Sequence, residues 1–123
     1  MSYYIGDFKK DSKENNHRGW LVGKFMETEP QKVGEVEIKY WEYGVGPTDH
    51  GTKIPKTFEC TFILQGESLA LIGNEETVLV AGQYVVIPPG TPNNLVKFIN
   101  QRIFGLTVKA PSDPSAKQVI PTK

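Results

Sequence analysis

The chain alternates short apolar runs with polar segments, and the clearest alternation spans residues 33–43. Within it three apolar positions alternate with three charged ones, namely Val36, Ile38 and Tyr40 with Glu35, Glu37 and Lys39. A period of two residues is typical of a strand with one buried and one hydrated face. We therefore predict a strand over 33–43, followed by a glycine- and proline-rich loop over 44–55.

Further apolar runs bounded by turn residues predict more strands. They lie at 57–64, 68–72, 77–80, 84–87, 94–99 and 102–109. Gly73-Asn74 and Asn100-Gln101 are typical turn dipeptides, so a hairpin is predicted around each. With no convincing helical period, this spacing predicts an all-β fold, a single antiparallel β-barrel or jelly roll. At 123 residues the chain has room for one such domain, spanning 1–123.

The two ends of the chain carry weaker patterns. Residues 1–16 and 110–123 are predicted to be loosely ordered, 9–16 as a polar loop and 110–123, with three prolines, as a surface tail. Between these ends, the segment 20–25 gathers large apolar residues next to glycines. That composition favours an N-terminal strand extension packed on the barrel over an amphipathic helix.

The segment 57–64 has two distinct faces. Thr57, Glu59, Thr61 and Ile63 share one face, and Phe58, Cys60, Phe62 and Leu64 share the other. If Glu59 faces the interior, an apolar row faces outward and requires a cover. We expect the segment 20–25 and a second copy of the chain to provide it, so a homodimer is predicted.

Two motifs carry a resemblance to a known family. Glu59 is followed by six residues and Gly66, and Gly82 by five residues, Pro88, one residue and Gly90. Their spacing resembles the two signature motifs of the cupin superfamily, which implies a small β-barrel that often holds a metal ion. The resemblance puts the metal ligands at Glu59, at two earlier histidine positions and at one later histidine position.

Most of those ligand positions are not histidine in this chain. The early positions fall on Thr52 and Ile54, or on Lys53 and Pro55 with a shorter spacer, and the late position falls on Asn93. A carboxylate with a neutral amide is a poor set of ligands for a transition metal. We therefore expect no metal and no other cofactor. A site of His17, His50 and Glu59 is an alternative that needs both histidines to reach the barrel from loops.

A lysine offers another role for Glu59. Lys97 lies four residues after Asn93, and alternate residues of a strand share a face. We predict a Glu59–Lys97 ion pair that lines a metal-free polar pocket together with Asn93. In the alternative, Lys97 lies past a bulge and points to water, which leaves Glu59 at a solvated mouth.

A second group of candidate ligand-binding residues is aromatic and cationic. Aromatic walls with a few polar heads suit sugars, nucleotides and other ringed ligands. Alternatively, Trp41 and Tyr43 complete a core or a dimer contact, and the segment 17–20 forms either a lid or a packed strand. The group consists of Trp41, Tyr43, His50, Lys53, Tyr84 and Arg102.

Composition narrows the classes of partner. Fourteen basic and fourteen acidic side chains cancel, which gives no electrostatic case for binding duplex nucleic acid or an anionic membrane. The single cysteine, Cys60, excludes an intramolecular disulfide and sits in an apolar strand, so a buried and inert thiol is expected. Without a signal-peptide pattern or a membrane-length apolar run, we expect a soluble cytoplasmic protein.

Several functions fit these observations. The first is a non-catalytic cupin-like protein that binds or sequesters a small polar or ringed ligand. The second is a metal-free sugar or sugar-nucleotide isomerase or epimerase, in which only His50 is placed to act as the base. A metal-dependent cupin enzyme and a purely structural role are further alternatives. No motif assigns a catalytic residue.

Overall fold

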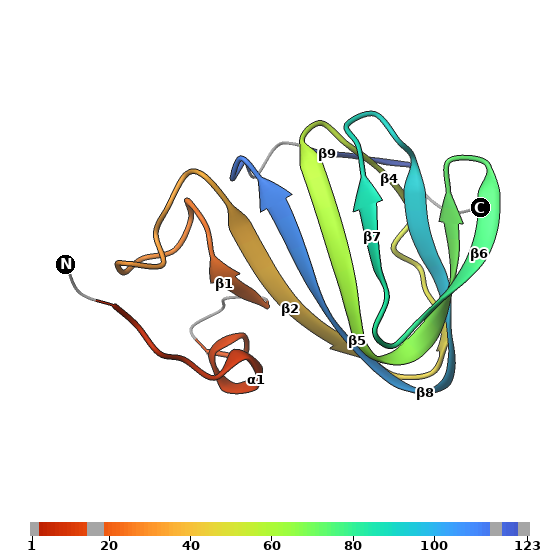
Figure 1. Cartoon of the computed structure of the whole chain (residues 1–123), viewed down its shortest axis with the longest axis horizontal. Coiled ribbons are helices and arrows are strands. Elements are labelled where there is room, and N and C mark those ends of the chain that lie inside the picture. The colour runs from red at the N-terminus through yellow and green to blue at the C-terminus, as the bar shows by residue number, and fades with distance from the viewer. Residues whose placement is uncertain (1–2, 15–18, 114–116, 121–123) are drawn as a thin grey trace.

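A computed structural model describes residues 3–14, 19–113 and 117–120, in which antiparallel strands predominate and the one helix is a single turn (Figure 1). The all-β prediction is confirmed. In chain order the elements are α1 (Phe8–Asp11), β1 (Trp20–Val22), β2 (Glu37–Tyr43), β3 (Gly46–Pro47), β4 (Thr52–Pro55), β5 (Phe58–Ile72), β6 (Glu75–Val80), β7 (Tyr84–Ile87), β8 (Asn93–Ala110) and β9 (Lys117–Ile120).

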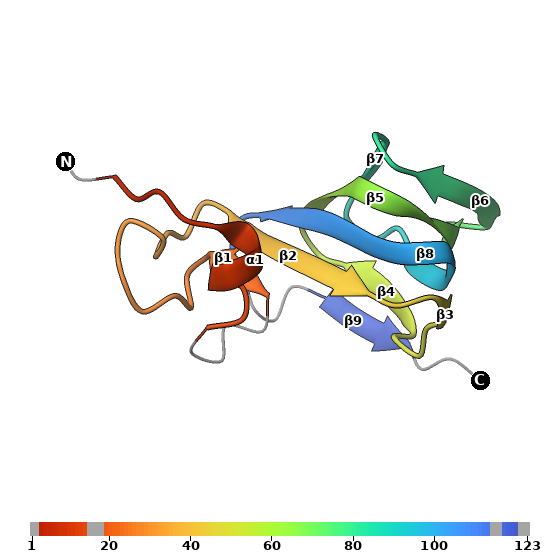
Figure 2. The ribbon, with the colours of Figure 1, turned by 90° about the horizontal axis from the view of Figure 1, so that it is seen from below.

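Two long strands, β5 and β8, run antiparallel to each other along the whole barrel. Their first and second halves belong to different layers. One layer has the order β1-β2-β8-β5-β7, and the other has the order β6-β5-β8-β4-β9. Figure 2 shows β4 and β9 on the opposite side of the molecule from β6 and β7. The result is a jelly-roll barrel closed by two shared strands.

Both shared strands bend at one place, where their register shifts. Gly66 has φ 86° and Asn100 has φ 68°, a left-handed conformation that glycine and asparagine tolerate. A Cβ on Gly66 would lie 2.9 Å from the Cα of Ile103, so the strands approach too closely there for a side chain. The predicted hairpin at Asn100-Gln101 is therefore wrong. The left-handed residue bends β8 without reversing it, because both halves of the strand remain paired with β5.

The other predicted hairpin is confirmed. Ile72 pairs with Glu75, so Gly73-Asn74 connects β5 to β6 as a two-residue turn, and Gly73 has φ 60°. The strand predicted at 84–87 is β7, with the same bounds. Turn residues thus located these strand ends correctly.

The hydrophobic core lies inside the barrel at the bend. Trp41 of β2, Phe98 of β8 and Leu79 of β6 meet there, so the core joins the two layers. Tyr43 adds a ring that stacks on Phe98 with centroids 5.2 Å apart. The buried set is Trp41, Ile63, Ala70, Leu79, Phe98 and Ile103.

The N-terminal segment lies beside and over β2. β1 pairs with β2, which confirms a strand extension, and Phe8 of α1 packs on Tyr40 with ring centroids 4.8 Å apart. The expected loop at 9–16 instead begins with a helical turn. Asp7 caps this turn by accepting a hydrogen bond from the Lys10 N–H at 3.1 Å.

The C-terminal tail forms a strand instead of wandering over the surface. β9 pairs antiparallel with β4 over Thr52–Pro55, so the tail supplies the partner that the edge of β4 requires. Ser112 and Asp113, earlier in the tail, are also held by hydrogen bonds. The Asp113 N–H donates to the buried carboxylate of Glu37 at 2.9 Å, and the Lys24 N–H donates to the Ser112 Oγ at 2.9 Å.

The two faces of β5 point as predicted. Glu59 is 1% exposed and faces the interior, whereas Phe58 and Phe62 are 41% and 37% exposed. The segment 20–25 does not cover this apolar row. Its strand β1 pairs with the outer edge of β2, so both β2 and β8 lie between β1 and β5. Predicting a fully hydrated face on β2 was also wrong, since Glu37 is buried and Lys39 is half-buried.

Helices in the described part of the chain are too short to cross a bilayer.

Candidate functional site

A cavity of about 270 Å³ opens between the two layers, next to the core. Its walls come from both layers, so the closure of the barrel creates it. Apolar side chains line one end, and polar and cationic side chains line the other. The lining residues are Trp20, Lys39, Trp41, Tyr43, His50, Lys53, Thr61, Ile72, Leu79, Val85, Ile87, Asn93, Asn94, Leu95, Thr107 and Lys109.

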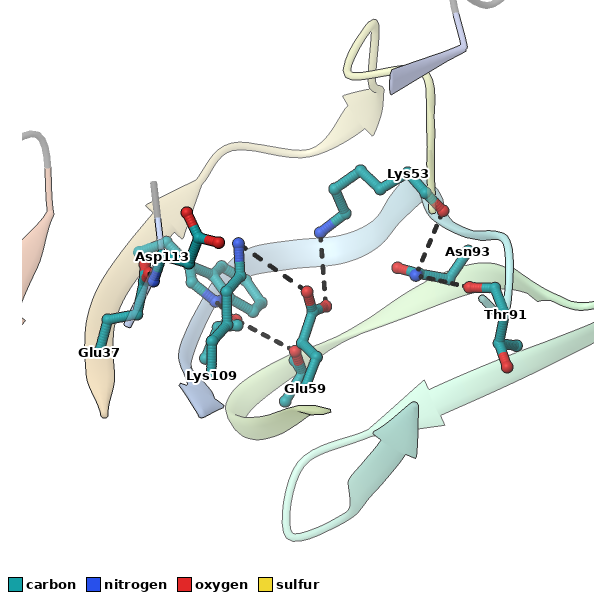
Figure 3. Close-up of polar contacts among 10 residues, drawn as sticks. Glu37, Lys53, Glu59, Thr91, Asn93, Lys109 and Asp113 are labelled. Carbon is teal, nitrogen blue, oxygen red and sulfur yellow. Dashed lines mark hydrogen bonds and ion pairs between the residues drawn. The ribbon is translucent and has the colours of Figure 1, made fainter. Parts of the chain in front are cut away.

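Glu59 lies at the polar end between two lysines (Figure 3). The Lys53 Nζ is 3.7 Å from its Oε2, and the Lys109 Nζ is 3.9 Å from its Oε1. Lys109 reaches this position because Glu59 and Lys109 are register partners on β5 and β8, so both point to the same face. Lys53 reaches it from β4, on the other layer. One carboxylate thus holds a cation from each layer.

These ion pairs are longer than hydrogen bonds. Neither carboxylate oxygen of Glu59 accepts a hydrogen bond from a described residue, although the side chain is 1% exposed. N–H···O hydrogen bonds are typically 2.7–3.2 Å long. A buried carboxylate without hydrogen bonds is unusual. The cost of removing the carboxylate of Glu59 from water is then offset only by its attraction to the two ammonium groups. The charges of Lys53 and Lys109, and not hydrogen bonds from them, therefore offset the burial of Glu59.

Asn93 is joined to the same cluster through Lys53. Its Nδ2 donates to the main-chain carbonyl oxygens of Lys53 at 3.4 Å and Thr91 at 3.3 Å (Figure 3). Asn93 and Lys53 are also register partners on β8 and β4. The Oδ1 of Asn94, its neighbour in the lining, is buried and accepts no hydrogen bond from the described part of the chain.

Hydrogen bonds fix the Trp41 side chain, which forms part of the cavity wall. The Trp41 Nε1–H donates to the Thr107 Oγ1 at 3.0 Å, and the Thr107 and Thr61 hydroxyl oxygens lie 3.0 Å apart. The indole lies flat against Gly105, where a Cβ would be 2.2 Å from its Cζ2. Trp41 therefore presents a fixed surface to the cavity. Residue 105 must be glycine for the Trp41 ring to occupy this position, because any side chain there would collide with it.

Tyr43 and His50 complete the aromatic wall, with ring centroids 5.0 Å apart. Burial raises the pKa of Tyr43 above its ordinary value of 10.0. Its phenol therefore stays protonated at neutral pH and offers a hydrogen-bond donor. His50 comes from the loop between β3 and β4 and lies at the edge of the wall.

Trp20 lies at the other edge of the cavity, against two of the lysines. The Nζ atoms of Lys39 and Lys109 are 5.4 Å and 5.6 Å from the centroid of its ring. Cations over an indole face are stabilised by the ring quadrupole. The N-terminal segment thus helps to hold the cationic end of the cavity.

The structure brings most of the predicted site residues together. Trp41, Tyr43, His50, Lys53 and Asn93 line one cavity. Glu59 is not part of this lining, but it lies directly behind it, paired with Lys53 and Lys109. Lys97 does not belong to this group, and the predicted Glu59–Lys97 pair is wrong. The register of β8 shifts between Leu95 and Lys97, so Lys97 lies past a bulge on the exposed surface. The alternative that placed Lys97 in water is correct for Lys97. Its expectation that Glu59 lies at a solvated mouth is wrong, because Glu59 is 1% exposed and paired with two lysines.

Two other predicted residues lie outside the cavity. Tyr84 is 63% exposed and pairs with Phe62 on the outer face, because its neighbours Val85 and Ile87 take the inner one. Arg102 donates to the Glu42 Oε1 at 2.9 Å on the outside of β2. Neither residue contributes to the lining.

Sequence reasoning missed Lys39, Lys109, Trp20 and Thr107. Lys39 was placed on the hydrated face of its strand, and Trp20 only in a packed strand or lid. The sequence does place Lys109 at the end of an apolar strand, where Glu59 begins another. A correct pairing of β5 with β8 would have brought these two residues together.

The cavity does not fit the metal ion that the cupin resemblance suggests. Among the described residues, no three His, Cys, Asp or Glu side chains are grouped as metal ligands. The carboxylate of Glu59 faces two ammonium groups, which would repel a cation. His17, part of the alternative metal site, lies outside the described residues.

Solved structures of other proteins share this fold. An uncharacterised conserved protein with a double-stranded β-helix domain from Klebsiella pneumoniae subsp. pneumoniae MGH 78578 is 17% identical, with a TM-score of 0.63 over 73% of this chain and 74% of that one. A cupin protein from Bacteroides fragilis is 16% identical, with a TM-score of 0.60 over 75% and 86% of the two chains. A DMSP lyase from Ruegeria pomeroyi DSS-3 is 18% identical, with a TM-score of 0.64 over 86% of this chain and 54% of the lyase.

These similarities show a cupin-type fold, as the two motifs predicted. No protein-family model matches the sequence, and no curated protein matches it. Because these identities are below one fifth, the similarities show the fold alone, and the function has to be inferred from the site.

Proposed function

We propose that this cupin-type barrel binds or sequesters a small polar or ringed ligand in its interior cavity, without a metal ion and without catalysis. The cavity joins an aromatic wall to a cluster of charged groups, a combination typical of small-molecule sites. Its size suits a small ligand, since a volume of about 270 Å³ lies just below the roughly 300–1,000 Å³ of typical ligand pockets.

The observation that carries this proposal is the burial of the Glu59 carboxylate without hydrogen bonds. This carboxylate is 1% exposed, and neither oxygen accepts a hydrogen bond from a described residue. It lies directly behind two lysines that line the cavity. A core selected for stability alone favours apolar residues of similar volume over such an ion cluster. Retaining three charged side chains here is consistent with recognition of a polar ligand.

A thermal-shift screen with sugars, nucleotides and small organic acids tests the proposal. A ligand present at about 100 times its Kd should raise Tm by roughly 10 °C. Each hit should then lose its effect in Trp41→Ala, where the wall is removed, and keep it in Lys97→Met. A screen without hits, or hits indifferent to Trp41, would contradict the proposal. Metal analysis of the purified protein completes the test, since a stoichiometric transition metal would overturn the metal-free reading.

An isomerase or epimerase activity is the second candidate, and the placement of His50 supports it. The imidazole lines the cavity beside Tyr43, so a base and a phenol lie on one wall. Incubating each hit with the protein and following its conversion by NMR separates the two functions. Turnover that His50→Gln abolishes, with binding retained, would favour the enzyme.

We also propose that two copies of the chain associate through the apolar outer face of the first layer. This outer patch consists of Phe58, Phe62, Leu64, Tyr84 and Val86, all 37% to 63% exposed. No outward position of β5 or β7 in this layer carries a charge, which leaves no basis for a charged partner. The formal net charge of the chain is zero, so two copies meet no net repulsion.

Sedimentation equilibrium measures this association. The chain should behave as a dimer at micromolar concentration, and Phe62→Asp should make it monomeric by placing a charge in the patch. The matched variant Lys97→Asp, on the exposed surface of β8, should remain dimeric. A monomeric native chain would contradict the proposed dimer and leave the ligand proposal intact.

A further inference from the structure

Charges of both signs meet at the polar end of the cavity. Lys39, Lys53 and Lys109 line it, and the Glu59 carboxylate lies behind the lining, near Lys53 and Lys109. A second buried carboxylate belongs to the same row of the sheet. Glu37 of β2, which is 2% exposed, is the register partner of Lys109, whose other register partner is Glu59. Because register partners share a face, Lys109 has a glutamate on each side of it.

Asp113 brings a third carboxylate to this row. Its main-chain N–H donates to the Glu37 Oε1 at 2.9 Å, and its side chain lies beside Lys109 in Figure 3. Among the described residues, three lysines and three carboxylates therefore meet at the polar end, and their formal charges cancel.

The three ammonium groups are also engaged individually. Lys53 and Lys109 lie 3.7 Å and 3.9 Å from the oxygens of Glu59, and Lys39 and Lys109 lie over the ring of Trp20. A charged ligand would add an uncompensated charge to this balanced cluster. An ion that leaves water for the cavity would lose its hydration and gain no net attraction, whereas a neutral molecule loses much less.

The aromatic wall adjoins this charged cluster and suits a flat molecule. Lys39 and Trp41 are alternate residues of β2, and both line the cavity. The rings of Trp41 and Tyr43 lie with their centroids 5.8 Å apart and their planes at 31°. Aromatic rings pack well against such a surface. The rest of the lining adds aliphatic side chains, namely Ile72, Leu79, Val85, Ile87 and Leu95.

We infer that the ligand of this cavity is an uncharged flat ring that carries a polar group, with the ring against Trp41 and the polar group toward the charged cluster. The inference rests on the proposed function and narrows it by charge and by shape. The protonated phenol of Tyr43 is a hydrogen-bond donor for such a group. Acids and amines built on the same ring are disfavoured, because each brings a charge that the cluster does not neutralise.

The experiment compares three flat probes of nearly the same shape at pH 7, the neutral benzamide, the anion benzoate and the cation benzamidinium. By isothermal titration calorimetry at low ionic strength, benzamide should bind about tenfold more tightly than either ion. Cyclohexanecarboxamide carries the same polar group on a puckered ring, and it should bind several-fold more weakly than benzamide.

Two variants shift the charge of the cluster in opposite directions. Glu59→Gln leaves one positive charge in excess, so the affinity for benzoate relative to benzamide should rise about tenfold. Lys53→Met leaves one negative charge in excess, so the affinity for benzamidinium relative to benzamide should rise by a similar factor. Lys97→Met, on the exposed surface of β8, should leave all ratios unchanged. If Lys53→Met does not fold, Lys53→Gln replaces it.

Different results overturn different claims. Native-chain binding of benzoate or benzamidinium as tight as that of benzamide would overturn the neutral ligand. Equal affinity for benzamide and cyclohexanecarboxamide would overturn the flat ring. Native ratios in both charge variants would show that these groups do not set the selectivity. If none of the four probes binds while another compound of the thermal-shift screen does, the inference fails and the proposed function stands. If no compound binds at all, both fail.

Discussion

Glu59 and Lys109 face each other across the β5–β8 ladder, with the Lys109 Nζ 3.9 Å from the Glu59 Oε1. Cross-strand partners on one face interact by virtue of register alone. The same ladder pairs Thr61 with Thr107, whose hydroxyl holds the Trp41 ring. The charged end and the aromatic wall of the cavity therefore depend on one alignment of two strands.

Replacing Glu59 with glutamine should destabilise the fold. Without the carboxylate, Lys53 and Lys109 lose the negative charge that lies between them, and the free energy of unfolding should fall by about 1–3 kcal/mol. Urea unfolding measures this effect, with the exposed Glu75→Gln as control. A Glu59→Gln variant as stable as the native chain would contradict the stabilising role of these ion pairs.

Gly105→Ala should damage the aromatic wall. Its Cβ would lie 2.2 Å from the Cζ2 of Trp41, so the indole must move and lose its hydrogen bond to Thr107. Overpacking of this kind costs about 1–3 kcal/mol. Gly44→Ala is the matched control, since a Cβ there meets nothing within 4 Å. Equal stability of the two variants in urea would show that Trp41 is not held as described.

The Glu42–Arg102 pair should make stability depend on pH below neutrality. Hydrogen bonding from Arg102 holds the pKa of Glu42 below its ordinary value of 4.5. A lowered folded-state pKa adds stability above pH 4.5, and this contribution is lost as pH falls through the folded value. The stability difference between the native chain and Glu42→Gln should therefore shrink as pH falls below 4.5. A difference that stays constant from pH 7 to pH 3 in urea titrations would contradict it.

Cys60 should react slowly in the folded chain. Burial raises the pKa of its thiol above 9.0, and the nearby charge of Glu59 raises it further. Since the thiolate is the reactive form, a disulfide reagent such as DTNB should label the native chain at least roughly tenfold more slowly than the urea-unfolded chain. Comparable rates in the two states would place the thiol at the surface.

Local patterns predicted those parts of the fold that depend on neighbouring residues. The alternation in 57–64 placed Glu59 inward and the phenylalanines outward, and turn residues located β7 and the Gly73-Asn74 hairpin. The bend at Asn100 was misread as a chain reversal, because a left-handed residue has the same signature in a turn and in a bulged strand.

The errors at the site have a related origin. Lys97 was placed by counting alternate residues from Asn93, but one bulge after Leu95 puts Lys97 on the exposed surface. Lys109 and Lys39 were missed because their role depends on pairing between distant strands, which no local pattern reveals. β9 was missed for the same reason, since its partner β4 lies more than sixty positions earlier in the chain.

The chain contains two tryptophans, and both line the same cavity, Trp20 at its edge and Trp41 in its wall. Its tryptophan fluorescence therefore originates entirely at the site and carries no background from indoles elsewhere. Any molecule that enters the barrel changes the surroundings of both emitters. Binding of unlabelled compounds can therefore be followed directly by the tryptophan emission of the protein.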